Sequence, residues 1–482
     1  MIWDNCSVIH GKIFCNRKLR LTSNEGTIAL SVRVLMCGRK KKLSFGIKLF
    51  TAFPHLGTGY DECTVKSRFT KNENQSNCCG DGHHTLATFL STPICPTIGQ
   101  EVGKQVAQEQ TPSPNESETG DDDLLLREFV PIPMLKTSAT DIRSAKFPVI
   151  DIHSHFGIRL KGDQARLQEF VEVMDRNRIR VCISLDCKLG EEESHIAFLK
   201  NHANRFGTFV HIDFKGAAAI DAPQDWACNQ NGFVRECVER LKVAKQNGCL
   251  GVKFFKQFGL GYRNGDGSLI KIDDPRFDPI WQACGELEMP VIIHTADPAA
   301  FFLPTDKNNE RWEELYRHPE WSFHGDQFPS REELLAARNR VIGNHPNTIF
   351  IGAHLANNSE DLAEVSKWLK EYPNLVVEPA SRINELGRQP YTARKFFIEH
   401  QDRILFGTDG PWPEQRLKYY WRFFETFDEN FPYSEKDPPP QGLWRINGIG
   451  LPDEVLEKLY YKNALRILPG LRGKYETGSE NR

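Results

Sequence analysis

From residue 147 onward, short apolar runs alternate with longer stretches in which apolar residues recur every three to four positions. The short runs are rich in β-branched and aromatic residues, which is typical of buried strands, and the longer stretches are typical of amphipathic helices. In residues 164–177, for example, Leu167, Phe170, Val171 and Met174 fall on one helical face, which predicts packing against a core. The predicted strands cover residues 148–153, 180–185, 208–213, 249–254, 290–294, 348–353, 374–378 and 403–408, and the predicted helices include 164–177, 234–247, 278–288, 331–344, 360–372 and 393–400.

The order of these elements predicts a fold class. Eight strand–helix units over roughly 260 residues match the number and length of a (β/α)8 TIM barrel. In that fold the active site lies at the carboxyl ends of the strands. A doubly wound open sheet would not gather the ends of strands one, five, six and eight around one point, whereas a closed barrel does. We therefore expect a (β/α)8 barrel over residues 147–470.

The residues before the barrel have a different composition. Residues 1–123 show no sustained period of 2 or 3.6, and residues 105–123 are polar, acidic and contain proline and serine, as disordered linkers do. We predict a poorly structured extension and linker over 1–123, an ordered arm over 124–146 in which residues 129–134 pack as an extended segment, and a flexible tail over 471–482. The extension has no clear function, and an upstream start site would also explain it.

Composition excludes several classes of protein. The formal net charge of −3 gives no global bias toward nucleic acid or anionic membranes, and the basic run Arg39–Lys42 is read as a solvated surface. No apolar stretch reaches the roughly 18–20 residues that a membrane span needs. Seven of the 13 cysteines lie in the first 95 residues and six after residue 180, with no CxxC pair, which favours a reducing compartment. We expect a cytoplasmic protein with a small-molecule substrate and no nucleic-acid or membrane partner, and a homodimer is compatible with such barrels.

Residues that bind metal or move protons stand where predicted strands end. His153 and His155 follow the first strand, and because strand residues two apart share a face, both imidazoles point to one place. His294 ends the fifth strand, His354 the sixth and Asp409 the eighth. One buried histidine is more often a hydrogen-bonded core residue, and one such aspartate is more often a helix cap. Four strands that end this way in one chain predict a metal site instead.

This constellation resembles the amidohydrolase superfamily, and in particular the amidohydrolase-related branch with the aminocarboxymuconate semialdehyde decarboxylase-like enzymes. The likeness covers residues 147–468. It implies one divalent metal ion, with zinc expected, bound by His153, His155, His294 and Asp409, although manganese, iron and cobalt suit the same ligands. It also implies catalytic roles for Asp409, as acceptor of a proton from metal-bound water, and for His354, which orients water or substrate and stabilises developing negative charge. Such an ion lowers the pKa of its bound water from about 15.7 to about 7.

Other residues near the strand ends are candidates for substrate binding. Lys253 lies on the fourth strand, where it anchors substrate, forms a structural ion pair or, as in binuclear members of the superfamily, is carboxylated and bridges two metals. Arg263, in the loop after that strand, is either a carboxylate-binding or a solvated arginine. Trp412 is expected to wall the pocket beside Asp409. Asp297, Arg382 and Arg388 are each as well explained by turns or surface loops. The aromatic insertion 301–333 is either an active-site lid or a rim that packs the barrel or an interface.

The predicted function is a metal-dependent hydrolase that attacks a small carbonyl substrate, such as an amide or a lactone, through metal-activated water. The rival is a metal-dependent non-oxidative decarboxylase of a small unsaturated or aromatic carboxylic acid, because the family it resembles carries out both reactions on one constellation. A metal-binding protein without activity is the third reading, and the intact set of five residues argues against it.

Overall fold

The computed structural model describes the strand segments within residues 5–68, Leu125, Phe129 and residues 131–477. Contacts divide the chain into two units, Met1–Gly120 and Asp121–Arg482. The first unit contains β1 (Asn5–Ile9), β2 (Lys12–Ser23), β3 (Gly26–Cys37), β4 (Ser44–Leu49) and β5 (Cys63–Arg68). They form antiparallel pairs in the orders β1-β2-β3 and β4-β5. These strands were not predicted, whereas the predicted linker 105–123 lies outside the described residues.

The second unit is built on a seven-stranded parallel sheet in the order β12-β11-β10-β9-β8-β7-β6, so each strand pairs with the one before it in the sequence. The strands are β6 (Val149–Ser154), β7 (Ile179–Lys188), β8 (Phe206–His211), β9 (Gly251–Phe254), β10 (Val291–Ile293), β11 (Phe350–Gly352) and β12 (Leu375–Val377). They coincide with the first seven predicted strands. Parallel strands buried on both faces read as continuous apolar runs, which is why the sequence located them well.

The eighth predicted strand, 403–408, is not a regular strand, and here the prediction of eight strands was wrong. This segment nevertheless forms backbone hydrogen bonds with both edge strands of the sheet, β6 and β12. The N–H of Leu405 donates to the carbonyl of Val377 on β12 at 2.9 Å, and the N–H of Ile152 on β6 donates to the carbonyl of Phe406 at 3.0 Å. Isolated bridges join Val377 to Ile404 and Ser154 to Gly410. The curled sheet therefore brings the carboxyl ends of β6 and β12 to opposite sides of the segment that leads to Asp409.

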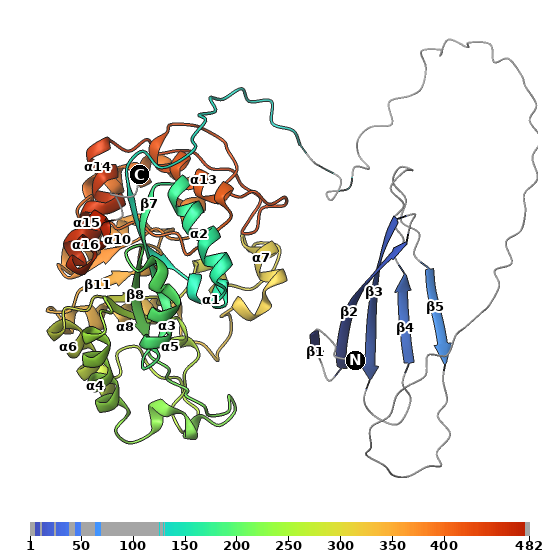
Figure 1. Cartoon of the computed structure of the whole chain (residues 1–482), viewed down its shortest axis with the longest axis horizontal. Helices are drawn as coiled ribbons and strands as arrows, with labels where there is room; N and C mark the ends of the chain where they lie inside the picture. Colours follow the sequence, from blue (N-terminus) through green and yellow to red (C-terminus); the bar gives the residue numbers. More distant parts are fainter. Residues whose placement is uncertain are drawn as a thin grey trace, which may run out of the picture. The chain divides into compact units, whose positions relative to one another are not determined.

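Helices follow the strands and cover the outside of the curled sheet, as Figure 1 shows for α2, α4 and α6. The helices are α1 (Phe156–Leu160), α2 (Gln164–Arg176), α3 (Glu192–Leu199), α4 (Phe233–Gln246), α5 (Gln257–Leu260), α6 (Asp278–Glu286), α7 (Trp312–Arg317), α8 (Arg331–Asn344), α9 (Ala353–Ala356), α10 (Leu362–Glu371), α11 (Ile383–Leu386), α12 (Pro390–Glu399), α13 (Glu414–Glu425), α14 (Asp453–Glu457), α15 (Asn463–Ile467) and α16 (Arg472–Thr477). On α2 the predicted residues Leu167, Phe170, Val171 and Met174 are the buried ones. Among the described helices, none is both long and apolar enough to cross a membrane.

Two core clusters fill the unit. One lies between the sheet and the helices, and the other contains inward-facing residues such as Ile152, Ile292 and Leu405. The six cysteines after residue 180 are buried free thiols, in agreement with their apolar surroundings in the sequence. A packed interior of this kind fixes the strand ends relative to one another and so positions whatever residues stand there.

The flanking segments differ from the expectation. Residues 129–134 of the arm before the barrel were expected to pack, yet Ile132 is 81% and Met134 87% exposed. The arm bonds the barrel further along, through Thr137, Thr140 and the carbonyl of buried Ala145. Proline at alternate positions favours an extended chain that cannot fold back on itself. The tail, expected to be flexible from residue 471, contains α16, and Tyr475 stacks on Tyr461 with ring centroids 5.4 Å apart. Residues 478–482 lie outside the described residues.

Candidate metal centre

The histidine pair after β6 meets Asp409 at the carboxyl end of the sheet. The Nε2 atoms of His153 and His155 lie 3.6 Å and 3.3 Å from Asp409 Oδ1, respectively. Ligand atoms of these three residues all lie within 4.8 Å of one another. His153 is fully buried, whereas His155 and Asp409 are partly exposed. Three of the four predicted metal ligands are thus brought together, and their arrangement leaves one side open.

Two buried carboxylates orient the histidines. Glu378, directly after β12, accepts a hydrogen bond from His153 Nδ1 at 2.7 Å, and Asp186 on β7 accepts one from His155 Nδ1 at 2.5 Å. Glu378 also accepts from the backbone N–H groups of His354 and Ala380. Neither carboxylate was predicted. Both stand at or just after the predicted strands 374–378 and 180–185, so the pattern that singled out the other strand-end residues would also have found them.

The chemistry of this donor set fits a divalent cation. Because a carboxylate accepts the proton of each Nδ1, the lone pair of a neutral imidazole is left on Nε2. Burial lowers the pKa of His153 well below its ordinary value, so the ring is neutral at neutral pH. His153 Nε2 is buried and has no hydrogen-bond partner among the described residues. A buried lone pair without a partner costs free energy, and two neutral imidazoles and a carboxylate are ligands that zinc and its neighbours accept.

The other two histidines form a second part of the site. The rings of His294 and His354 lie 4.6 Å apart, and His354 lies 5.0 Å from the ring of His153. His294 Nε2, however, is 3.2 Å from Asp297 Oδ1, and Asp297 is ion-paired with Lys256 at 2.5 Å. His294 is thus not part of the group in which the ligand atoms of His153, His155 and Asp409 converge. Its role as a ligand stays a prediction.

His354 has a fixed orientation and tautomer. Its Nδ1 donates to the carbonyl of Ala380 at 2.7 Å, which leaves the lone pair on Nε2. Burial, followed by the charge of Arg382, lowers the pKa of His354 well below its ordinary value. His354 is consequently a neutral hydrogen-bond acceptor at Nε2.

Three side chains of the site stand on strained backbone. His354, Ser381 and Asp409 have φ values of 55°, 56° and 63°, in the left-handed region that residues with a Cβ avoid. The strain at His354 continues to Asn357, and buried arginines of α8 hold that segment: Arg338 donates to the carbonyl of Ala356 and Arg331 to that of Asn357. Backbone strain of this kind persists where the surroundings enforce it and is concentrated at functional sites.

Lys253 is buried within the same end of the sheet. It is 1% exposed, its Nζ has no hydrogen-bond partner among the described residues, and Phe255 lies beneath it at 5.4 Å. Burial lowers its pKa to about 8. A structural ion pair, one of the three alternatives for this residue, is absent within the described part of the chain. Substrate binding and carboxylation stay open.

The remaining residues that were candidates for substrate binding lie in different surroundings. The guanidinium of Arg263 donates to the carbonyl of Gly267 within its own loop, and the structure gives it no contact with the histidines. Trp412 donates from Nε1 to the carbonyl of Thr408 and lies between two guanidinium groups, those of Arg159 at 4.2 Å and Arg416 at 4.7 Å. Arg388 pairs with Glu310 at the surface, whereas Arg382 is 6% exposed and donates to the carbonyl of Ser381.

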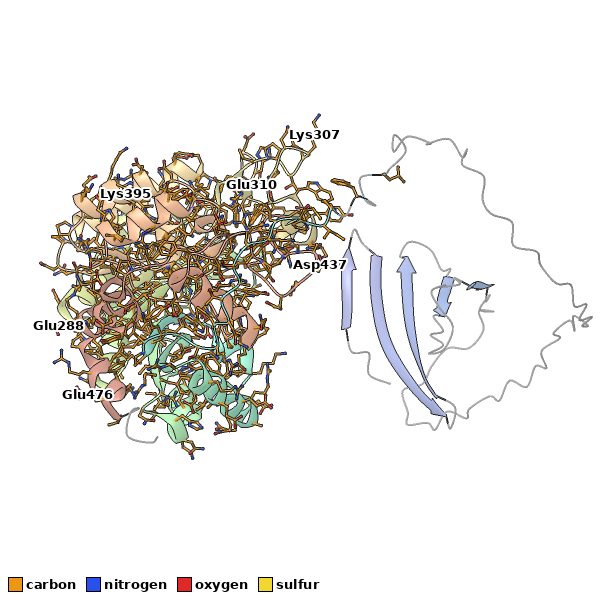
Figure 2. The ribbon with its side chains drawn as sticks, turned by 90° about the horizontal axis from the view of Figure 1, so that it is seen from above. Glu288, Lys307, Glu310, Lys395, Asp437 and Glu476 are labelled. Atoms are coloured by element: carbon orange, nitrogen blue, oxygen red, sulfur yellow. The ribbon has the colours of Figure 1, made fainter. Side chains whose placement is uncertain are left out.

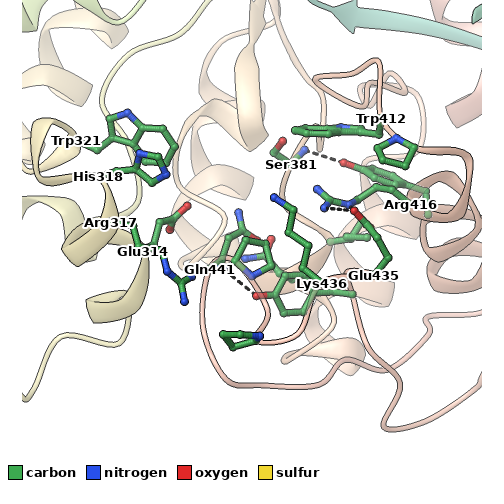
Figure 3. Close-up of a pocket in the computed structure, with 17 residues that line it drawn as sticks. Glu314, Arg317, His318, Trp321, Ser381, Trp412, Arg416, Glu435, Lys436 and Gln441 are labelled. Atoms are coloured by element: carbon green, nitrogen blue, oxygen red, sulfur yellow. Dashed lines mark hydrogen bonds and ion pairs between the residues drawn. The ribbon is translucent and has the colours of Figure 1, made fainter. Parts of the chain in front are cut away.

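A cavity of about 420 Å³ opens beside Asp409, and Figure 3 shows its lining. Ser381 connects the two, because its hydroxyl donates to Asp409 Oδ2 at 3.0 Å and it also lines the cavity. Trp412 lines it as predicted, and α7 and the following turn supply Glu314, Arg317, His318 and Trp321. The insertion 301–333 thus contributes a wall of the cavity. A curled parallel sheet with such a donor set and cavity at its carboxyl end belongs to the class of metal-dependent barrel enzymes.

Comparison with known protein families agrees with this class. The amidohydrolase family matches residues 150–470, and the chain belongs to this family. No curated protein matches the chain. Members of the superfamily are metal-dependent enzymes, so the chain is assigned as an amidohydrolase-superfamily enzyme with a candidate metal site at His153, His155 and Asp409.

Several solved structures are similar to the chain. One is 2,6-dihydroxybenzoate decarboxylase from Rhizobium, with a TM-score of 0.40 and 16% identity over 67% of this chain and 99% of that one. Another is dihydroxybenzoic acid decarboxylase from Polaromonas sp. JS666 with bound manganese, with a TM-score of 0.40 and 16% identity over 68% and 99%. A third is 4-oxalomesaconate hydratase from Rhodopseudomonas palustris, with a TM-score of 0.40 and 12% identity over 68% and 98%. None of these likenesses assigns a substrate to this chain.

Proposed function

We propose that the protein is a metal-dependent hydrolase that adds water to a small carbonyl substrate. The observation that carries the proposal is the group formed by His153, His155 and Asp409, whose imidazole lone pairs and carboxylate converge beside an open cavity. A divalent ion held there, with zinc expected, would supply Lewis acidity and lower the pKa of water. The family match supports the reaction class at the level of the superfamily.

The chain's own residues have separate roles in this proposal. Asp409 Oδ1 faces the two imidazoles and would hold the ion, whereas Oδ2, which accepts one hydrogen bond from Ser381, keeps a second lone pair with which to accept a proton from water. His354 offers an acceptor at Nε2, which suits it to orient a water molecule or a substrate N–H or O–H. Its low pKa argues against the other predicted role, stabilisation of negative charge, because that role requires a proton on Nε2. His294 completes the ligand set if its ring turns from Asp297.

Non-oxidative decarboxylation is the second candidate, and a specific observation favours it. Lys253 and Arg382 are both buried near the histidines, and neither forms an ion pair with a carboxylate among the described residues. A buried cation without a direct ion pair favours a substrate that brings its own carboxylate. Lys253 and Arg382 would then hold the carboxylate that leaves as carbon dioxide.

Product analysis in ¹⁸O-labelled water separates the two reactions. The metal-loaded full chain is incubated with small amides, lactones and aromatic acids, and products are identified by mass spectrometry. Hydrolysis places one labelled oxygen in the product and releases no carbon dioxide. Carbon dioxide release without label in the organic product would reject the hydrolase and establish the decarboxylase. The Asp409→Asn variant serves as the control for background reaction, and His354→Asn tests the role of the second histidine.

A further inference from the structure

The cavity beside Asp409 has a charged wall that the proposed function does not use. Its lining includes the cations Arg317, Arg416 and Lys436 and the carboxylates Glu314 and Glu435. They come from three places in the chain: α7, the start of α13 and the loop 433–441 that follows α13. In Figure 3, Lys436 projects between Trp321 and His318 on one side and Trp412 and Arg416 on the other.

Both acidic groups of the wall are already paired. Glu435 accepts two hydrogen bonds from Arg416, from Nε at 3.0 Å and from Nη2 at 2.9 Å. Glu314 is bonded to the buried guanidinium of Arg311 at 2.8 Å. Only Glu435 has a guanidinium to itself, because Arg311 also pairs with the buried carboxylate of Glu385.

Two cations of the wall have no direct partner, although the charge of Lys436 also acts on the neighbouring carboxylate of Glu435, which Arg416 holds. Neither Lys436 Nζ nor the Arg317 guanidinium has a hydrogen bond or ion pair to any described residue of the chain. Both residues are exposed, so each charge is solvated and free to meet a ligand that enters the cavity. Asp437, the acidic neighbour of Lys436, is not among the lining residues.

The rest of the lining suits a flat ligand. Trp321, Trp412, Tyr420 and Tyr433 line the cavity, and aromatic faces stack on planar groups. Ser381 marks the end of the cavity next to Asp409, and Lys436 comes from a different loop of the lining. A ligand that reaches from Ser381 to Lys436 would present its reacting group at one end and a second polar group at the other.

We propose that this cavity is a substrate subsite in which Lys436, with Arg317, binds an oxyanion of a planar substrate whose reacting group lies at Asp409. The inference rests on the proposed function for the identity of the reacting end. It adds the substrate class: an aromatic or otherwise planar molecule with a carboxylate or a phosphate remote from the bond that breaks. Lys436 and Arg317 set specificity in this assignment and take no part in the chemistry.

The test measures binding rather than turnover. Rigid diacids of increasing length (benzene-1,4-, naphthalene-2,6- and biphenyl-4,4′-dicarboxylate) are each compared with their monoacid by calorimetry on the metal-loaded full chain. We expect at least one diacid to bind roughly tenfold more tightly than its monoacid, as a charge-assisted contact provides. Lys436→Gln should reduce that preference to about twofold or less, and Arg317→Gln should reduce it in part.

The matched control is Lys395→Gln. Lys395 is an exposed lysine on α12 that lines no part of this cavity, and Figure 2 shows it away from Asp437, the neighbour of Lys436. This variant should keep the full preference. A second ligand, in which a phosphate ester replaces the distal carboxylate, distinguishes the two kinds of oxyanion. The ligand that binds more tightly indicates whether the substrate carries a carboxylate or a phosphate.

Equal affinity of every diacid and its monoacid, including no measurable binding of either, would overturn the inference. A preference that survives both Lys436→Gln and Arg317→Gln would also overturn it. Metal content and turnover are measured on the same samples. A preference that depends on Lys436 in a protein without hydrolytic or decarboxylating activity would reject the proposed function and keep the subsite, whereas normal turnover without the preference would reject the subsite alone.

Discussion

The two ends of the candidate site are built in different ways. At the buried end, His153 is fully buried, Glu378 fixes its ring, and the backbone that carries His354 and Asp409 is held in the left-handed region. At the other end, Arg317 and Lys436 stand exposed on α7 and on a loop and form no hydrogen bond or ion pair with a described residue. Rigid, dehydrated groups suit a metal and proton transfer, whereas solvated charges suit recognition of a substrate that varies among related enzymes. The comparison therefore places the reaction at the buried end of the site and the recognition of substrate at the exposed end.

The largest effect on turnover is expected when a metal ligand at the buried end is removed. His153→Gln should abolish turnover of the substrate found by product analysis, by about a thousandfold or more, because several kcal/mol of Lewis-acid stabilisation are lost. Steady-state rates measure the effect. His345→Gln, at a half-buried histidine next to Asp278, is the control and should keep wild-type rates. Retained activity in His153→Gln would remove this histidine from the mechanism.

The second prediction concerns stability. Lys253 is buried, and its pKa falls from 10.5 to about 8, so Lys253→Met should raise the free energy of unfolding at pH 7 by on the order of 3 kcal/mol. Below pH 8 the lysine is protonated in both native and unfolded protein, and the cost of burial is present in full. Between pH 8 and 10.5 the native state releases its proton first, so the wild type gains stability and the difference from the variant narrows.

Urea unfolding of both proteins across pH 6–11 measures that difference. Lys395→Met, at an exposed lysine, should leave stability almost unchanged. A destabilised Lys253→Met protein, or a difference that does not change with pH, would show that Lys253 has a compensating partner in the native protein.

A smaller effect is expected from the carboxylates behind the histidines. Glu378→Gln places an amide N–H₂ where a carboxylate oxygen accepts from a backbone N–H, which disturbs the orientation of His153. Metal affinity should fall about 10- to 100-fold, as is usual when such a partner of a ligand is removed. Competition with a chelator measures the affinity. Glu399→Gln, at a carboxylate that pairs with Lys370 on the surface, is the control, and equal affinities in the two variants would contradict the orienting role.

At the exposed end, the smallest effect is the loss of diacid preference in Lys436→Gln, roughly tenfold in affinity with no change in metal content. If this substitution also removed the metal, the two ends of the site would not be separate.

The parts of the fold and site that could be predicted from the sequence follow from local pattern. The strands from β6 to β12 are continuous apolar runs, and the HxH spacing of His153 and His155 directs both rings to one side without tertiary information. Asp409 follows the same rule although its strand is irregular, because the segment 403–408 still bonds β6 and β12. The strands β1 to β5 of the first unit were missed, although on β3 apolar residues occupy every second position from Ile28 to Met36, which is the pattern that predicts a strand.

What could not be predicted depends on distant partners. Glu378 and Asp186 stand at strand ends that the pattern could have flagged, but their pairing with His153 and His155 arises only when the sheet curls. The position of His294 depends on Asp297 and Lys256, whose ion pair no spacing indicates. Lys436 was missed because a lysine in a proline-rich loop has no periodicity, and Arg263 was considered instead because it follows a strand. Loops carry specificity, and their side-chain positions are set by tertiary packing.

The most direct test of the central claim is the metal content of purified protein, measured per chain by mass spectrometry for wild type and Asp409→Asn. The account predicts about one equivalent of a divalent transition metal in the wild type and a clear loss in the variant, since Asp409 Oδ1 is one of three converging ligand atoms. No metal in wild-type protein prepared without chelators, or equal content in the two proteins, would contradict the claim that His153, His155 and Asp409 form a metal centre.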